Sequence, residues 1–191
     1  MDKRIRSAAA AFGALGGVPC NFALEETLRG KVYSVLVLAV LLCSSGVWYL
    51  REDLLAKLRS FRNRCCRAMC RITMVQTRRC RIPSVQLHRR LDITAMDQYY
   101  RCRLLRWSGH VSCMPMDRLP RQLLTGIVAE NPRPTGSPLV TWGRTLQKVL
   151  IKCGQSPSFT VWRQAAADRM FRRQMCGQFT RLCSSRWSKH G

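Results

Sequence analysis

Residues 51–72 read REDLLAKLRSFRNRCCRAMCRI, and the spacing of their apolar side chains indicates a helix. Apolar positions recur every three or four residues, which is the period of a helix that buries one face. These positions are Leu54, Leu55, Leu58, Phe61, Cys65, Met69 and Ile72. The other faces carry Arg59, Arg62, Arg64, Arg67 and Arg71. The stretch therefore predicts an amphipathic helix with a strongly basic surface.

Helical patterns on both sides of this stretch predict a mostly α fold. Helices are expected near residues 4–15, 25–48, 84–92, 94–111, 141–152 and 160–175. Thr94 and Asp97 resemble a capping box, in which the two side chains bind free backbone amides at a helix start. We expect neither β-strands nor an internal repeat.

The expected organisation is a helical bundle followed by a linker and shorter helices. An alanine-rich helix would occupy residues 1–22, the basic bundle residues 23–82 and a helical connection residues 83–130. Three prolines and a glycine between Asn131 and Pro138 predict a Pro-rich linker over residues 131–140. Short helices at 141–176 and a frayed tail at 177–191 would complete the chain.

The charge of the chain predicts a polyanionic partner. Its 191 residues include 33 Lys and Arg against 10 Asp and Glu, a net charge of +23, yet 47% of the residues are hydrophobic. That much apolar surface excludes a disordered basic tail. Between Lys57 and Arg106, 14 basic residues stand against 2 acidic ones. The partner is expected to be nucleic acid or an anionic membrane surface.

Residues 32–50 offer an alternative function, because 19 consecutive uncharged residues approach the length of a membrane span. The alternative is a basic membrane-associated protein anchored through this segment. Three serines and Gly46 dilute its hydrophobicity, so we favour a buried core helix and expect no membrane partner.

The start of the chain has no clean cleavage site for a targeting peptide. The 11 cysteines are irregularly spaced and are expected to be reduced thiols. Both features predict a nuclear or cytoplasmic protein that is not secreted.

The sequence offers little catalytic or metal-binding chemistry. No two aspartates are adjacent, so the carboxylate pair that holds two metal ions in polymerases is absent, and no glycine-rich phosphate loop occurs. The tightest candidates for a zinc site are Cys66 with Cys70 and His110 with Cys113, two pairs that are far apart in the sequence. We predict no catalytic residue, no metal and no cofactor.

Residues 104–120, which read LLRWSGHVSCMPMDRLP, carry a resemblance to a known family. They are similar to the region that follows the polymerase core in non-LTR retrotransposon reverse transcriptases, with its Trp-x-Gly-His-Val, Met-Pro and Asp-Arg motifs. Further segments match in the same order, so the resemblance spans residues 4–175. The matching motif positions are Trp107, Gly109, His110, Asp117, Arg118, Trp142, Asp168 and Arg169.

The resemblance implies a thumb and C-terminal region without the catalytic palm. The family's RNA-directed DNA polymerase activity depends on an Asp pair in the palm and on Mg²⁺, so this chain is expected to be a fragment with no polymerase activity of its own. Its expected partners are the missing palm and the RNA and DNA backbones of a template–primer duplex, bound without sequence preference. The expected phosphate contacts are Arg59, Arg62, Arg64, Arg67, Arg71, Arg101, Arg103 and Arg106.

Overall fold

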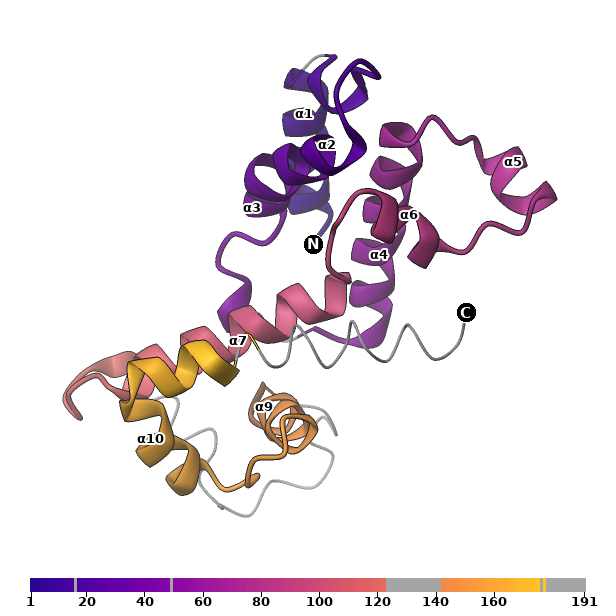
Figure 1. The fold of residues 1–191 in the computed structure, drawn as a ribbon. Helices are drawn as coiled ribbons and strands as arrows, with labels where there is room; N and C mark the ends of the chain where they lie inside the picture. The colour runs from indigo at the N-terminus through magenta and orange to yellow at the C-terminus, as the bar shows by residue number, and fades with distance from the viewer. Residues whose placement is uncertain (16, 49, 123–141, 176, 178–191) are drawn as a thin grey trace. The chain divides into compact units, whose positions relative to one another are not determined.

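The computed structural model describes all residues except 16, 49, 123–141, 176 and 178–191 (Figure 1). The described residues form helices joined by turns and contain no strand, which confirms the mostly α fold. The predicted linker at 131–140 and the predicted tail from residue 178 on lie outside the described residues. The chain divides into two compact units: residues 1–43 with 52–97, and residues 44–51 with the described residues from Gln98 on.

The first unit begins with a helical hairpin. Helix α1 (Asp2–Ala14) leads through the short 3₁₀ turn η1 (Val18–Cys20) to α2 (Glu26–Val32), which runs through the π-helical turn η2 (Tyr33–Val37) into α3 (Leu38–Leu41). The ring of Phe12 on α1 meets the ring of Tyr33 edge-on, with centroids 6.4 Å apart. The helix expected at 25–48 therefore ends at Leu41, because Ser44 takes a left-handed conformation with φ of 59°.

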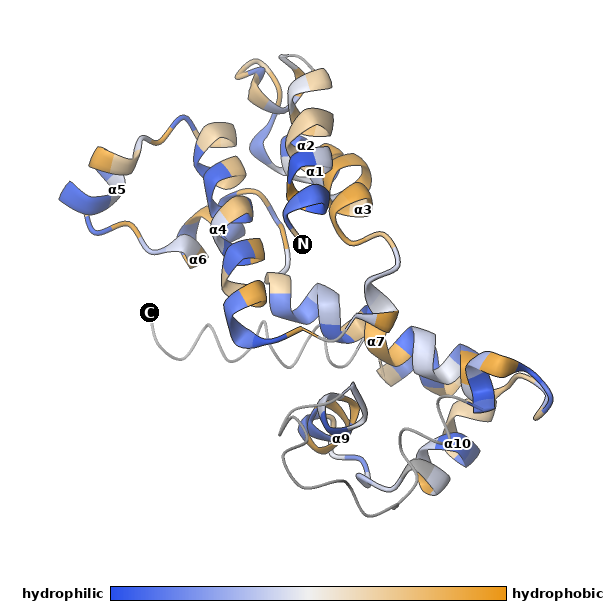
Figure 2. Ribbon diagram, turned by 180° about the vertical axis from the view of Figure 1, so that it is seen from behind, coloured by the Kyte–Doolittle hydropathy of each residue, from blue (hydrophilic) through white to orange (hydrophobic). Residues whose placement is uncertain are grey.

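The uncharged segment 32–50 supplies core side chains. Tyr33, Val37, Leu38 and Leu41 are at most 2% exposed, and Figure 2 shows α3 as a largely hydrophobic helix. After Leu41 the chain turns into the 3₁₀ helix η3 (Ser45–Val47), so the segment is not one continuous helix. Within the described ranges, no helix combines the length and the hydropathy that a membrane crossing requires.

Leu38→Arg tests whether this segment is core. Leu38 is 2% exposed, so an arginine there buries an uncompensated charge, and we expect the free energy of unfolding to fall by about 4 kcal/mol or more. Val35→Arg is the matched control: Val35 lies in the same segment but is 68% exposed, and its substitution should change stability by less than about 0.5 kcal/mol. Urea denaturation measures both. Equal effects would contradict the core assignment.

Helix α4 (Glu52–Met69) confirms the amphipathic helix predicted from residues 51–72. Leu55, Leu58, Phe61, Cys65 and Met69 are buried, and Figure 2 shows hydrophilic and hydrophobic residues mixed along the helix. Acidic residues occupy the first turn and a basic residue the last, as the helix dipole favours. The helix ends three residues before the predicted end.

Three successive helices of the first unit share one kind of ending. After α4, α5 (Met74–Arg79) and α6 (Ser84–Arg90), a residue in the left-handed conformation is followed by an isoleucine. The isoleucine amide donates to a carbonyl five residues back, at 2.9 Å after α4 and α6 and at 3.0 Å after α5. This is the Schellman ending, in which the left-handed position usually belongs to glycine. Here it is occupied by Arg71, Arg81 and Asp92, with φ between 48° and 56°.

The first two of these endings belong to a short repeat in the sequence, so the expectation of no internal repeat is wrong. Residues 70–76 read CRITMVQ and residues 80–86 read CRIPSVQ, ten positions later. In the first copy Thr73 caps α5, accepting from the amide of Gln76 while the Gln76 side chain accepts from the amide of Thr73. In the second copy Pro83 precedes the first residue of α6. Each copy thus starts a short helix.

Helix α7 (Met96–Ser112) begins close to the predicted position, but its first carboxylate has another role than capping. Both carboxylate oxygens of Asp97 accept hydrogen bonds from Arg59 on α4. The helix starts at Met96, so Thr94 lies two residues before the helix and not at its N-cap position. The predicted capping box at Thr94 and Asp97 is therefore corrected to an ion pair within the first unit.

The second unit packs η3, α7, α9 (Trp142–Lys152) and α10 (Phe159–Ala167) around an apolar core. Leu104, Leu105, Val111, Leu146 and Trp162 are at most 2% exposed. Helix α9 agrees with the helix predicted at 141–152. The single helix predicted at 160–175 is interrupted: α10 ends at Ala167, and residues 169–175 form a separate helical segment.

Candidate nucleic-acid interface

Arg59 on α4 is held by two carboxylates. Its Nε donates to Asp97 Oδ1 at 2.7 Å, one terminal nitrogen donates to Asp97 Oδ2 at 2.5 Å and the other to Glu52 at 2.5 Å. These hydrogen bonds raise the pKa of the Arg59 guanidinium. Three of the five N–H donors of Arg59 are thus bound to carboxylates, which gives the residue a structural role, while a phosphate contact at Arg59 stays a prediction.

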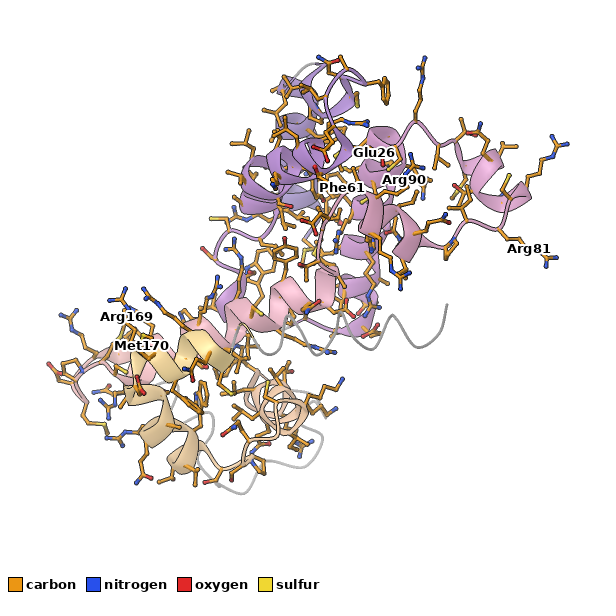
Figure 3. All side chains as sticks on the ribbon, viewed as in Figure 1. Glu26, Phe61, Arg81, Arg90, Arg169 and Met170 are labelled. Atoms are coloured by element: carbon orange, nitrogen blue, oxygen red, sulfur yellow. The ribbon has the colours of Figure 1, made fainter. Side chains whose placement is uncertain are left out.

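Glu26 on α2 holds two more arginines of the first unit. Its carboxylate accepts two hydrogen bonds from Arg90, one of them 2.8 Å long, and lies 3.7 Å from Arg29. Figure 3 shows Glu26 and Arg90 pointing toward each other. The hydrogen bond from Arg90 lowers the pKa of Glu26. Arg29 is nearly buried and donates to the carbonyl of Met69 at the end of α4. This cluster joins α2, α4 and α6.

Arg62 is 1% exposed, so the predicted phosphate contact there is wrong. The position lies four residues after Leu58 and four before Cys66, both fully buried, and thus falls within the inner face of α4. Burial and the charge of Arg62 together lower the pKa of His88 to about 4. A ring nitrogen of His88 lies 3.1 Å from Asn63 Oδ1. Arg62 is a core residue whose charge acts on its neighbours.

His88 makes the stability of the first unit depend on pH. Its pKa is about 4 in the folded chain against 6.5 ordinarily, so the unfolded state takes up the proton first and stability falls as the pH drops from about 6.5 toward 4. The expected loss is about 1 to 3 kcal/mol. His88→Gln should flatten the curve between pH 5 and 6.5, where few carboxylates titrate, whereas His110→Gln, at an exposed histidine, should not. An unchanged slope for His88→Gln would refute this assignment.

Most solvent-facing arginines of the first unit lie in a segment of the sequence that has no acidic residue. Residues 54–91 contain no Asp or Glu. Besides Arg59, Arg62 and Arg90, seven arginines of this segment are exposed or, for Arg67, half-buried. We call them the basic surface: Arg64, Arg67, Arg71, Arg78, Arg79, Arg81 and Arg89. Three of the predicted contacts, Arg64, Arg67 and Arg71, belong to it. The other four were missed, although the CRI repeat and the lack of acidic residues mark them.

Helix α5 carries the most exposed part of the basic surface. None of its residues is buried, Val75 is 72% exposed, and Figure 1 shows the helix standing away from α4 and α6. Arg78 and Arg79 form its last turn, and Arg81 follows in the left-handed turn, where Figure 3 shows its side chain pointing outward. A short helix without buried residues contributes little to the hydrophobic core, so its side chains are available to a partner.

Aromatic rings orient two guanidinium groups of the basic surface. The guanidinium carbon of Arg64 lies 5.6 Å from the ring centre of Phe61, and that of Arg71 lies 4.8 Å from the ring centre of Phe22. Such contacts restrict the side chain and leave the edge donors open to phosphate. The guanidinium carbon of Arg29 also lies over the ring of Phe22, 5.1 Å from the ring centre.

The three remaining predicted contacts belong to the second unit. Arg101 and Arg103 are half-buried on α7, and Arg106 is exposed. The eight predicted phosphate contacts thus separate into two paired or buried residues, three members of the basic surface, and three residues of the other unit.

Several family-motif positions serve packing in the second unit. The rings of Trp107 and Trp142 meet edge-to-face, with centroids 5.0 Å apart, and Trp142 Nε1 donates to the carbonyl of Gly46 at 2.9 Å. A Cβ on Gly46 would lie 2.5 Å from Trp107 Cβ, so only glycine fits there. A Cβ on Gly109 would lie 2.5 Å from Arg172 Cδ. These contacts place Gly109 and Trp142 in the core, with the half-buried Trp107 packed against Trp142.

The polar motif positions lie at the surface. Asp168 Oδ1 accepts from the amide of Met170 at 2.7 Å, which caps the helical segment 169–175. His110, Asp117, Arg118 and Arg169 are exposed. In the part of the chain that the structure describes, the polar motif residues do not come together as a group of metal ligands.

The two cysteine and histidine pairs considered for zinc lie in different units, Cys66 and Cys70 in the first and His110 and Cys113 in the second. In the part of the chain that the structure describes, no group of three or more His, Cys, Asp or Glu side chains could hold a metal ion. Burial raises the pKa of Cys65 to about 12 and that of Cys66 to about 11, so both are inert thiols.

Comparisons with protein-family models, with curated proteins and with solved structures found no match to this chain.

Proposed function

We propose that this chain binds the phosphate backbones of RNA and DNA through the basic surface of its first unit, without polymerase activity of its own. The observation that carries the proposal is the acid-free segment 54–91, where seven arginines reach solvent while Arg59, Arg62 and Arg90 serve the fold. Arginine offers a planar fork of donors that fits phosphate oxygens, and backbone contacts of this kind carry no sequence information.

The left-handed arginines support the proposal further. Arg71 and Arg81 occupy positions that glycine would fill without strain, with φ of 56° and 48°. Arginine at these two positions keeps a cation at the surface where glycine would relieve the strain, which favours a use for the side chain. The repeat places these two arginines ten residues apart, one on each side of α5.

The resemblance at residues 104–120 suggests the origin of this activity. A thumb-like region of a non-LTR retrotransposon reverse transcriptase would grip a template–primer duplex by its backbones, and its palm would be the second partner. The alternative, a membrane anchor at residues 32–50, has less support, because Tyr33, Val37, Leu38 and Leu41 are buried in the first unit.

Arg81→Gly separates binding from folding. Glycine suits the left-handed turn, so the free energy of unfolding should stay the same or rise by up to about 1 kcal/mol, while affinity for an RNA–DNA duplex falls. Loss of one phosphate contact should also reduce the salt slope of binding by about 1. Fluorescence anisotropy with a labelled duplex measures the affinity and the salt slope.

Asp92→Gly is the matched control, because Asp92 occupies the equivalent left-handed turn with φ of 49° but carries the opposite charge. It should relieve the same strain without weakening binding. Adding Arg78→Gln and Arg79→Gln to Arg81→Gly should weaken binding further. If the triple variant binds as tightly as the unmodified chain, α5 is not part of the interface.

A further inference from the structure

A polar pocket of about 580 Å³ opens in the second unit, where the end of α7 meets α10. Its polar lining consists of Ser112, Cys113, Arg121, Thr160, Arg163 and Gln164. Two of these side chains are cations, and the described lining residues include no carboxylate. The pocket is therefore an electropositive cavity of the size that small organic ligands occupy.

One face of α10 forms a wall of the pocket. Thr160, Arg163 and Gln164 are spaced by three and four residues and so share a helix face. Trp162 and Ala166, which lie between and after them, are at most 2% exposed and anchor the helix in the core. The buried residues fix the rotation of α10, which presents a guanidinium, a hydroxyl and an amide to the pocket.

The opposite side of the pocket is formed by residues at and beyond the end of α7. Arg121 is only 7% exposed, and one of its nitrogens donates to the carbonyl of Met114, which holds the guanidinium in place. The Cys113 thiol donates to the carbonyl oxygen of Ala166 at 3.4 Å, which joins the end of α7 to α10 beside the pocket.

We propose that this pocket binds a phosphate monoester carried by a nucleoside, with Arg121 and Arg163 as its charged ligands. A phosphate monoester has two negative charges and three terminal oxygens, which match two guanidinium groups supported by a hydroxyl and an amide donor. The volume exceeds the needs of a bare phosphate and leaves room for the attached nucleoside. All lining residues belong to the second unit, so the site is independent of the basic surface.

The alkylation rate of Cys113 provides a local readout. Cys113 is an exposed free thiol that lines the pocket, and its modification by iodoacetamide can be followed by peptide mass spectrometry on the full chain. Adenosine 5′-monophosphate should slow this reaction about tenfold at saturation, whereas adenosine should not. Inorganic phosphate should protect only at higher concentration. Cys43, an exposed cysteine of the first unit that lies outside the basic surface, should react at an unchanged rate.

Arg163→Ala removes one charged ligand at an exposed position and should weaken nucleotide protection of Cys113 about tenfold, the effect of losing a charge-assisted hydrogen bond. Arg144→Ala removes the same group from an exposed position on α9 that does not line the pocket, and it should leave protection unchanged. Neither variant should alter duplex binding by Arg81, so this test and the test of the proposed function fail separately.

Two oligonucleotides identify the source of the phosphate monoester. If a single strand with a 5′-phosphate protects Cys113 better than the nucleotide, while the same strand with a 5′-hydroxyl does not, the ligand is a strand terminus. If the nucleotide protects as well as the strand, the ligand is a free nucleotide. The proposal is overturned if Cys113 reacts at the same rate with and without the nucleotide, if Cys43 is protected equally, or if Arg163→Ala keeps full protection.

Discussion

The shortage of carboxylates constrains every other feature of this chain. With 10 acidic residues against 33 lysines and arginines, only a minority of the cations can be paired within the fold. Glu26, Glu52 and Asp97 are used at the points where helices of the first unit meet, on Arg29, Arg59 and Arg90. The pairs decide which arginines stabilise the fold. The cations left at the surface repel one another, and an anionic partner would relieve that repulsion.

The same residue type thus has three physical roles in one helix region. Arg59 is paired, Arg62 is buried beside Cys66 and His88, and Arg64 lies over the ring of Phe61 at the surface. Burial and the charge of Arg62 lower the pKa of the neighbouring histidine, pairing holds the Arg59 side chain in place, and exposure leaves Arg64 open to a partner. Mutating arginines of this region as a group would mix the three effects, which explains why single positions such as Arg81 are more informative.

Helical periodicity was enough to predict the fold class and most helices, because an amphipathic helix repeats its apolar positions regardless of its partners. The inward position of Arg62 follows from its spacing of four residues from both Leu58 and Cys66, but Cys66 was not counted among the apolar positions of the predicted helix. The pairing of Arg59 with Asp97 joins residues 38 positions apart, and no local pattern shows it. Of the missed arginines, Arg81 was visible in the CRI repeat, while Arg78 and Arg79 of α5 were marked only by the lack of acidic residues around them. The motif tryptophans could be located from sequence, but their packing on Gly46 required the structure.

The salt dependence of duplex binding tests the central claim most directly. Six to seven phosphate contacts through the basic surface predict that affinity for an RNA–DNA duplex falls about a thousandfold or more between 50 and 200 mM salt, equally for unrelated sequences. The logarithm of the association constant should fall linearly with the logarithm of the salt concentration. A flat response, or an affinity that depends on the base sequence, would contradict a surface that binds phosphates.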